Sequence, residues 1–293
     1  MDPHLLRTFV AVVRTGSFSS AARELGYTQA AVSQQIASLE NDLKVTLLRR
    51  RPVATTEAGA RLLEHAGPIL LRIQAARSEL VRLGSAARSR LRVGASPLAA
   101  VHIAGPLAEA RRSHPRLDVA VQVLPRAGIA AAVATGELDI GLVDGAAAPS
   151  DPLRLDDAVP ITAVAVDERP LVVPLPVSHP LAARPGLDLD GLVDALWLDA
   201  PDAAVPLPSL RHVTGARDGF RPSFACEGGD PALLIDLVSA GHGLAALPAG
   251  LAAGHPGLVE VPVRAPRIVH RTELLHPRTI GPASASFVAA VAR

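Results

Sequence analysis

Cysteine, lysine and aromatic residues are scarce in this chain of 293 residues. Cys226 is the only cysteine, so no disulfide can form within the chain, and we expect the reducing cytoplasm as its compartment. Aromatic residues make up only 2% of the sequence, so the core must be built from Ala, Val, Leu and Ile. No uninterrupted apolar stretch approaches the roughly 20 residues that a membrane-spanning helix needs, which argues against a membrane protein.

Positive and negative charges nearly balance over the whole chain, with a formal net charge of +1, but they are unevenly distributed along it. Residues 1–90 carry 13 Lys and Arg against 7 Asp and Glu, whereas the remaining residues carry 16 against 21. A basic first third joined to an acidic remainder indicates that only the first part meets a polyanion. Chance clustering of charge is the competing explanation. The length predicts two or three domains.

Three helices are expected before residue 44. The first covers residues 1–16, the second Ser20–Leu25 and the third about Gln29–Leu43. Each follows residues that favour the N-cap position, namely Asp2, Ser17 or Ser19, and Thr28. Gly16 and Gly26 end the first two helices. In the third, apolar residues at spacings of 4, 3 and 4 predict a buried stripe, consisting of Val32, Ile36, Leu39 and Leu43.

The second and third helices, joined by a short turn that contains glycine, predict a helix-turn-helix. The outer face of the third helix is polar, with Gln29, Ser33, Gln34, Ser38 and Asn41. Short amide and hydroxyl side chains can reach base edges in the major groove of DNA. An ordinary solvated helix face is the alternative. The basic turn that follows, Leu48–Val53, favours DNA because it suits a β-wing whose arginines hold phosphates.

One long helix is expected over residues 57–83. Apolar residues recur along it at alternating spacings of 4 and 3, namely Leu62, Ala66, Ile69, Ile73, Ala76, Leu80 and Leu83. This heptad seam predicts pairing with a second helix, and packing against the chain's own domain is the alternative. Pro68 lies inside the pattern and predicts a kink. Ser85–Ser89 is expected to be a hinge.

From residue 90 onward, strands and helices alternate. Strands are expected at Leu91–Ala95, Leu117–Leu124 and Leu138–Val143, with helices at 97–113 and 128–135 between them. This β-α-β pattern is typical of a parallel sheet covered on both faces. It recurs with strands at 171–174, 197–199 and 243–247 and with helices at 189–195 and 231–240. Two α/β lobes therefore fit about 200 residues.

The segment Leu6–Gly59 carries a dense set of residue types at fixed offsets. They are Phe9, Gly16-Ser17-Phe18, Ala21-Ala22, Leu25, Gln29, Val32-Ser33, Gln35-Ile36, Leu39-Glu40, Leu47, Arg50 and Thr56-Glu57-Ala58-Gly59. In this set the chain resembles the LysR-type transcriptional regulators. Residues 136–140 and 239–248 resemble the same family more loosely. The sequence departs from it at Ala30, Lys44, Thr46 and Leu48, and the wing is about two residues shorter than usual.

The resemblance implies a winged helix-turn-helix at 1–59, a dimerising linker helix and hinge at 60–89, and an effector-binding domain at 90–293. The last is expected to be an α/β domain like a periplasmic binding protein. Its first lobe would cover about 90–165 and 270–293 and its second about 166–269, with chain crossings near 164–166 and 269–270. The implied partners are a palindromic double-stranded DNA operator, a small-molecule effector, a second copy of the chain in a dimer or tetramer, and RNA polymerase.

The resemblance and the polar helix face together select eight candidate DNA contacts. Groove contacts are expected from Thr28, Gln29, Ser33, Gln34 and Ser38, and phosphate contacts from Arg49, Arg50 and Arg51. A pure helix cap is the alternative for Thr28. Gln34 stands where the family frequently has Arg, which predicts an altered base preference.

Six residues are candidates for the effector site. Two of them are Ser96 and Trp197, and the resemblance places the other four, Asp144, Asp199, Glu227 and Leu247, near the cleft. Ser96 lies between a strand end and a helix start, where free N–H groups and a hydroxyl suit an anion, with simple N-capping as the alternative. Asp144 and Asp199 would repel a carboxylate and point instead to an amine or polyol. Trp197 either stacks on the ligand or fills the core, and the core is favoured.

No pattern indicates catalysis, a metal or a cofactor. Cys226 has no partner cysteine for a dithiol switch, and His residues lack metal-ligand spacing. No nucleophile elbow is present. We therefore expect a regulator and not an enzyme. Two alternatives stay open: a solute-binding or enzymatic α/β protein with a basic appendage, and a regulator that has lost effector sensing.

Overall fold

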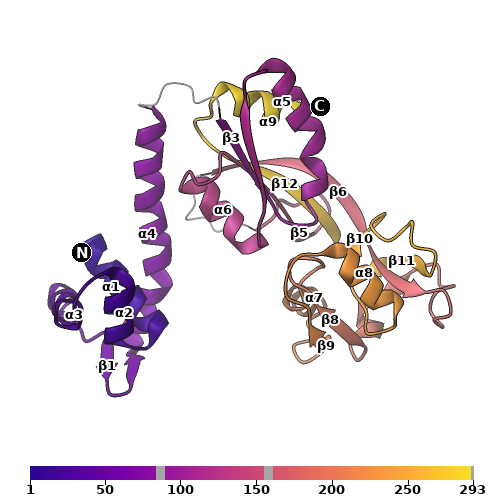
Figure 1. Cartoon of the computed structure of the whole chain (residues 1–293). Helices are drawn as coiled ribbons and strands as arrows, with labels where there is room; N and C mark the ends of the chain where they lie inside the picture. Colours follow the sequence, from indigo (N-terminus) through magenta and orange to yellow (C-terminus); the bar gives the residue numbers. More distant parts are fainter. Residues whose placement is uncertain (84–89, 155–160, 292–293) are drawn as a thin grey trace. The chain divides into compact units, whose positions relative to one another are not determined.

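The computed structural model describes residues 1–83, 90–154 and 161–291, with only the backbone of residues 82 and 83. It forms two compact units, which divide between Leu80 and Val81 (Figure 1). The expected hinge at 85–89 and the side chain of Leu83 lie outside the described part.

Three short helices open the N-terminal unit, namely α1 (Pro3–Thr15), α2 (Phe18–Leu25) and α3 (Gln29–Leu43). Their N-caps are side-chain oxygens of Asp2, Ser17 and Thr28, which accept backbone N–H groups at 2.8, 3.3 and 3.1 Å. Capping supplies partners to N–H groups that a helix leaves unpaired. The expected helices are confirmed, although α2 begins two residues before Ser20.

The C-caps of these helices all adopt the left-handed conformation. Gly16 and Gly26, with φ of 63° and 70°, end α1 and α2. At the end of α3, Lys44 has φ of 58°, in a region where glycine is favoured because it lacks a Cβ. The departure from the family at this position therefore places a side chain in an unfavourable backbone conformation.

The core of the N-terminal unit is apolar. Val32, Ile36 and Leu39 of the expected stripe are fully buried, together with Leu6 and Phe9 of α1. Beside this core, Glu40 accepts hydrogen bonds from the backbone N–H groups of Leu47 and Leu48 at 2.8 and 3.2 Å. The Glu40 carboxylate therefore holds the chain that leads from α3 into the wing.

The wing is a two-stranded antiparallel hairpin of β1 (Leu48–Arg50) and β2 (Val53–Thr55). After it, the Thr56 hydroxyl donates to the carbonyl of Thr46 at 2.7 Å and accepts the N–H of Gly59 at 3.0 Å. A Cβ at Gly59 would lie 2.1 Å from the carbonyl oxygen of Leu47. Glycine is needed there because the long helix passes directly against the backbone that precedes the wing.

The long helix α4 spans Glu57–Leu83, as expected, and continues through Pro68. Three seam residues near its start, Leu62, Ala66 and Ile69, pack on the core of the N-terminal unit. The alternative interpretation of the seam therefore holds for its first half. Further along, Ala76 and Leu80 are exposed, with 69% of Leu80 accessible to solvent.

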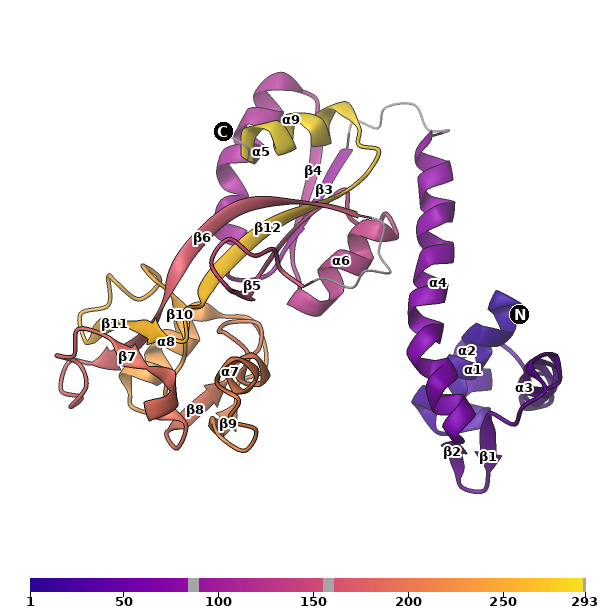
Figure 2. The same ribbon diagram turned by 180° about the vertical axis from the view of Figure 1, so that it is seen from behind.

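The C-terminal unit begins with a mixed sheet. Its parallel strands β3 (Arg90–Ala95), β4 (Asp118–Val123) and β5 (Ile140–Ala147) continue into the antiparallel strands β12 (Val269–Pro277) and β6 (Ile161–Pro176). The sheet order is β4-β3-β5-β12-β6-β11-β7, in which β11 is Leu258–Ala265 and β7 is Leu187–Asp188. The helices α5 (Ala104–Ser113) and α9 (Pro282–Val291) cover one face of this part, and α6 (Arg126–Ala134) covers the other (Figure 2).

Strand β6 runs through both lobes. Up to Pro170 it pairs with β12, and from Leu171 it pairs with β10 (Leu247–Pro248) and β11 (Leu258–Ala265). The change of partner comes later along the chain than the expected crossing near 164–166. The strand expected at 171–174 is thus the end of a much longer one, because a continuous strand carries the chain between lobes.

The remaining elements complete the second lobe. They are β7 (Leu187–Asp188), the 3₁₀ turn η2 (Leu189–Leu192), β8 (Leu196–Asp199), α7 (Leu207–Thr214), β9 (Arg221–Ala225) and α8 (Pro231–Ser239).

The helix expected at 189–195 is only η2, and the strand expected at 243–247 is only β10 plus an isolated bridge from Leu244 to Trp197. The helix expected at 97–113 is split into the 3₁₀ turn η1 (Ala100–His102) and α5. Short apolar runs such as these do not distinguish a strand from a turn.

Candidate functional sites

The exposed face of α3 carries the polar residues that the sequence selected. Gln29, Gln34 and Ser38 are exposed and Ser33 is half-buried. Thr28 is exposed as well, and its hydroxyl caps the helix, as its alternative interpretation expected. These five side chains come from one helix and the residue before it.

Arg50 connects the wing to this face of α3. Its Nη1 donates to the hydroxyl of Ser33 at 2.9 Å, and its guanidinium lies 5.5 Å from the centroid of the Phe18 ring. A guanidinium over an aromatic face is attracted by the ring's charge distribution. Sequence reasoning placed Ser33 and Arg50 in separate groups, and the structure brings them together. Arg49 and Arg51 are exposed on either side.

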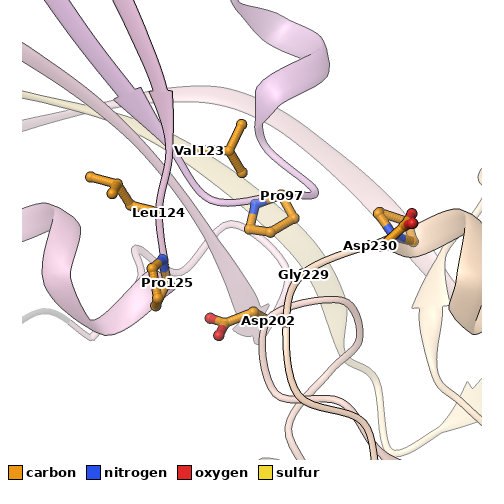
Figure 3. A pocket seen from close by; sticks show the side chains of 9 residues that line it. Pro97, Val123, Leu124, Pro125, Asp202, Gly229 and Asp230 are labelled. Atoms are coloured by element: carbon orange, nitrogen blue, oxygen red, sulfur yellow. The ribbon is translucent and has the colours of Figure 1, made fainter.

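A pocket of about 590 Å³ lies in the C-terminal unit (Figure 3). Segments far apart in the sequence line it, namely Pro97 and 123–125 from the first lobe, and Asp202 and 228–231 from the second. The two sides touch at Gly229, where a Cβ would lie 2.1 Å from Cγ of Pro97. The pocket therefore sits where the two lobes meet.

Beside the pocket, a buried carboxylate gathers three polar side chains. Asp144, which is 1% exposed, accepts hydrogen bonds from the Ser96 hydroxyl, from Nη2 of Arg126 at 2.6 Å and from Nε2 of His270 at 2.9 Å. Burial raises the pKa of Asp144, but the His270 hydrogen bond and the Arg126 charge outweigh it and hold the pKa below its usual value. The carboxylate is thus ionised and neutralised internally.

Arg126 also joins the first lobe to the second. Its backbone N–H donates to Oδ1 of Asp202 at 2.8 Å, and its Nη1 donates to the carbonyl of Pro201 at 2.5 Å. One residue at the start of α6 thus binds the buried Asp144 and the loop that follows β8. Sequence reasoning missed Arg126, Asp202 and His270, because no local pattern links residues so far apart in the chain.

The six residues expected at the effector site are dispersed. Ser96 and Asp144 lie together but are buried and bonded to each other. Trp197 is fully buried in the second-lobe core, where its Nε1 donates to the carbonyl of Leu192 at 3.1 Å. Leu247 is fully buried in a second apolar cluster of that lobe. Their burial favours a core role for Trp197 and Leu247.

The other two, Asp199 and Glu227, are more accessible. Asp199 is half-buried at the end of β8, and Glu227 is exposed beside the pocket residue Gly228. Among the residues that the structure describes, none of the expected six lines the pocket itself. Ser96 and Glu227 are sequence neighbours of its lining residues. The position of Ser96 between a strand end and a helix start was therefore the sequence signal that identified the neighbourhood of the pocket.

Within residues 1–83, 90–154 and 161–291, no group of three His, Cys, Asp or Glu side chains is arranged to hold a metal ion. None of the helices in those ranges is long and apolar enough to cross a membrane.

Two family models match the chain. Residues 3–60 match the bacterial regulatory helix-turn-helix protein of the lysR family, and residues 84–293 match the LysR substrate binding domain. The chain belongs to the LysR family of transcriptional regulators. The winged helix-turn-helix and the two-lobed α/β domain are accordingly confirmed as its fold, and DNA-binding transcription regulation with an effector-binding domain as its function.

Individual proteins match this chain over most of their length. The chain is 31% identical to the uncharacterized regulator YnfL of Escherichia coli over 250 residues, which cover 83% of this chain and 81% of YnfL. The crystal structure of full-length BenM matches with a TM-score of 0.55 at 24% identity, covering 100% of this chain and 96% of BenM. CbnR complexed with its target DNA matches with a TM-score of 0.50 at 23% identity, covering 100% and 99% of the two chains.

Proposed function

We propose that α3 and the wing form the surface with which this LysR regulator recognises its operator. The observation that supports this most directly is the bond between Arg50 and Ser33, which fastens the wing beside the polar face of α3. In this proposal the groove contacts come from Thr28, Gln29, Ser33, Gln34 and Ser38, and the phosphate contacts from Arg49, Arg50 and Arg51. Phosphate contacts position the protein, and base contacts carry the specificity.

The long helix α4 serves self-association. Its seam residues Leu62, Ala66 and Ile69 already pack within the N-terminal unit, whereas Ala76 and Leu80 remain exposed. Burying a leucine that is 69% exposed is favourable, so a second copy of α4 is the expected partner for the later part of the seam. A two-fold dimer then reads two half-sites, so the operator is palindromic.

The pocket between the lobes is the effector site, and residues 90–293 form the effector-binding domain that follows the DNA-binding part (1–59) and the linker (60–89). Pockets at lobe interfaces are the usual place for small ligands. A ligand that binds one lobe spacing better than another shifts the protein toward that state and so changes DNA binding or promoter activation. The regulator acts in the cytoplasm, on the nucleoid when DNA-bound, with RNA polymerase as a further partner.

The DNA proposal is tested by fluorescence anisotropy of the full chain with the DNA upstream of its own gene and with a scrambled duplex, at several salt concentrations. We expect the native duplex to bind far more tightly. Gln29→Ala should erode this preference, since it removes a base contact. Arg50→Ala should weaken binding to both duplexes and reduce the salt dependence, since fewer counterions are released.

Arg61 provides the matched control, because it is an exposed arginine on α4 that forms only a surface pair with Glu64 at 3.3 Å. Arg61→Ala is expected to leave both affinities unchanged. Equal, weak binding of the two duplexes with no effect of Gln29→Ala or Arg50→Ala would contradict the proposed surface for this DNA. A genome-wide binding selection would then decide between another operator and another surface.

A further inference from the structure

The N-terminus of α6 has no cap from its own lobe. Pro125 precedes the helix and provides no side-chain acceptor, so the first N–H group of α6, that of Arg126, needs a partner elsewhere. That partner is Oδ1 of Asp202 at 2.8 Å, which belongs to the second lobe. The helix is therefore capped across the lobe interface.

The side chain of Arg126 engages the same loop of the second lobe. Nη1 donates to the carbonyl of Pro201, while Nη2 binds the buried Asp144. The Arg126 side chain is 17% exposed, so water screens these contacts only partly. The Asp202 carboxylate thus binds the backbone N–H at the positive start of α6, while the adjacent Arg126 guanidinium bonds to Pro201 and Asp144.

This arrangement is what a protein uses to bind a free carboxylate. Helix N-termini favour anions because their N–H groups are unpaired and the helix dipole is positive at that end, and a nearby arginine adds positive charge. Here the anion is attached to the chain at the rim of the pocket, as the close view of Asp202 and Pro125 shows (Figure 3). The second carboxylate of the lining, Asp230, caps its own helix α8 through the N–H of Ala232 at 2.9 Å.

Among the described residues, the lining of the pocket contains no basic side chain. Apart from the two carboxylates, the described lining residues are apolar or glycine, namely Pro97, Val123, Leu124, Pro125, Gly228, Gly229 and Pro231. An anionic ligand would therefore meet two carboxylates and no available cation. An uncharged ligand, or one that carries an amine, meets apolar walls and two acceptors.

We propose that Asp202 is a tethered carboxylate ligand of the first lobe and determines the specificity of the pocket. By occupying the anion subsite at Arg126, it restricts the effector to uncharged or amine-bearing small molecules. This inference rests on the proposal that the pocket is the effector site. A ligand that carried a carboxylate to the start of α6 would first have to displace Asp202 from the backbone N–H of Arg126.

Chemical rescue tests the proposal in the full chain. Asp202→Ala removes the tethered carboxylate and leaves room for a free one, and acetate is the probe. In sodium chloride, the melting temperature of the C-terminal unit, followed through Trp197, should fall by about 2–4 °C, because one charge-assisted cap is lost from a unit of this size. Acetate at equal ionic strength should restore it in a saturable manner, since a ligand of the folded state stabilises by mass action.

Two variants and the wild type serve as controls. Asp202→Asn keeps the side-chain volume, so acetate should have no effect on it. Asp230→Ala vacates a helix N-terminus on the same pocket that lacks an arginine, so acetate should restore its melting temperature much less. The wild-type protein should not respond, because its subsite is occupied.

Three results would overturn the proposal. They are acetate stabilisation of the wild type equal to that of Asp202→Ala, equal rescue of Asp202→Ala and Asp230→Ala, and a folded Asp202→Ala protein with a lowered melting temperature that acetate does not change. DNA binding is measured on the same samples by anisotropy. A wild type without operator preference would count against the proposed function, whereas the acetate result would still decide the role of Asp202.

Discussion

The two units of this chain differ in which side chains they bury. Among the described residues, the N-terminal unit buries one polar side chain, Thr8, whereas the C-terminal unit buries six, namely Ser96, Asp144, His270, Thr272, Glu273 and Ser284. The N-terminal unit keeps its polar groups at helix caps and on the face proposed to meet DNA. In the C-terminal unit, Ser96, Asp144 and His270 lie together beside the pocket, whereas Thr272 and Glu273 lie on β12 and Ser284 on α9.

This difference has consequences for stability. In an apolar core, the loss of stability caused by a substitution grows with the side-chain volume that is removed or added. A buried charge depends on each of its partners, because removal of one leaves another uncompensated in a medium of low polarity. We therefore expect the two units to be sensitive to different kinds of substitution.

The largest effect is expected from Asp144→Ala, which leaves Arg126 and His270 without their buried carboxylate. The free energy of unfolding of the C-terminal unit should fall by about 3–5 kcal/mol. Urea unfolding followed by fluorescence measures this, because Trp197 is the only tryptophan and lies in that unit. Asp118→Ala is the control, since its pair with Arg90 is exposed and should change stability by less than about 1 kcal/mol.

The next effect concerns backbone packing in the N-terminal unit. Gly59→Ala should destabilise it by about 1–3 kcal/mol, because the new Cβ overlaps the carbonyl oxygen of Leu47. Gly67→Ala in the same helix meets nothing within 4 Å and should stabilise it by up to about 1 kcal/mol. Hydrogen exchange of the α1–α3 amides reports both changes. Equal effects of the two substitutions would contradict the close approach at Gly59.

A smaller gain is expected at the end of α3. Lys44→Gly should stabilise the N-terminal unit by about 0.5–1 kcal/mol, because glycine adopts the φ of 58° without steric conflict. The same hydrogen-exchange measurement applies. Val45→Gly is the matched control in the neighbouring residue, which is outside the helix and has no positive φ. A loss of stability in Lys44→Gly would indicate that the lysine side chain itself contributes at this position.

The smallest effect is a pH dependence of the stability of the C-terminal unit. Burial lowers the pKa of His102, and the Asp167 carboxylate opposes this only in part. Since the unfolded chain binds the proton more readily, stability should decline as the pH falls from about 6.5 toward the lowered pKa. Asp144, whose pKa is also lowered, extends the loss to still lower pH. Urea unfolding between pH 7 and 5 should show a shallower decline in His102→Gln than in the wild type.

The N-terminal unit could be predicted nearly residue by residue. The caps at Asp2 and Thr28 and the start of α4 could be predicted, and the cap of α2 was narrowed to Ser17 or Ser19, because capping and helical periodicity act between residues a few positions apart. The apolar seam on α4 could be predicted, but the surface that covers it could not, because the spacing of apolar residues does not distinguish a partner helix from the chain's own core. The contact of Arg50 with Ser33 was not predicted either, because a wing folds back over a distance that spacing does not encode.

In the C-terminal unit, the sequence by itself determined the alternation of strands and helices and the placement of Ser96 at a strand end. Only the tertiary structure decided that Ser96 and Asp144 bond to each other, that Trp197 lies in the core, and that Asp202 caps α6 from the other lobe. The physical reason is that periodicity and capping are local, whereas the partner of a buried charge is whichever group the fold brings to it. The DNA-binding part was therefore decided mainly by neighbours in the chain, and the pocket by neighbours in space.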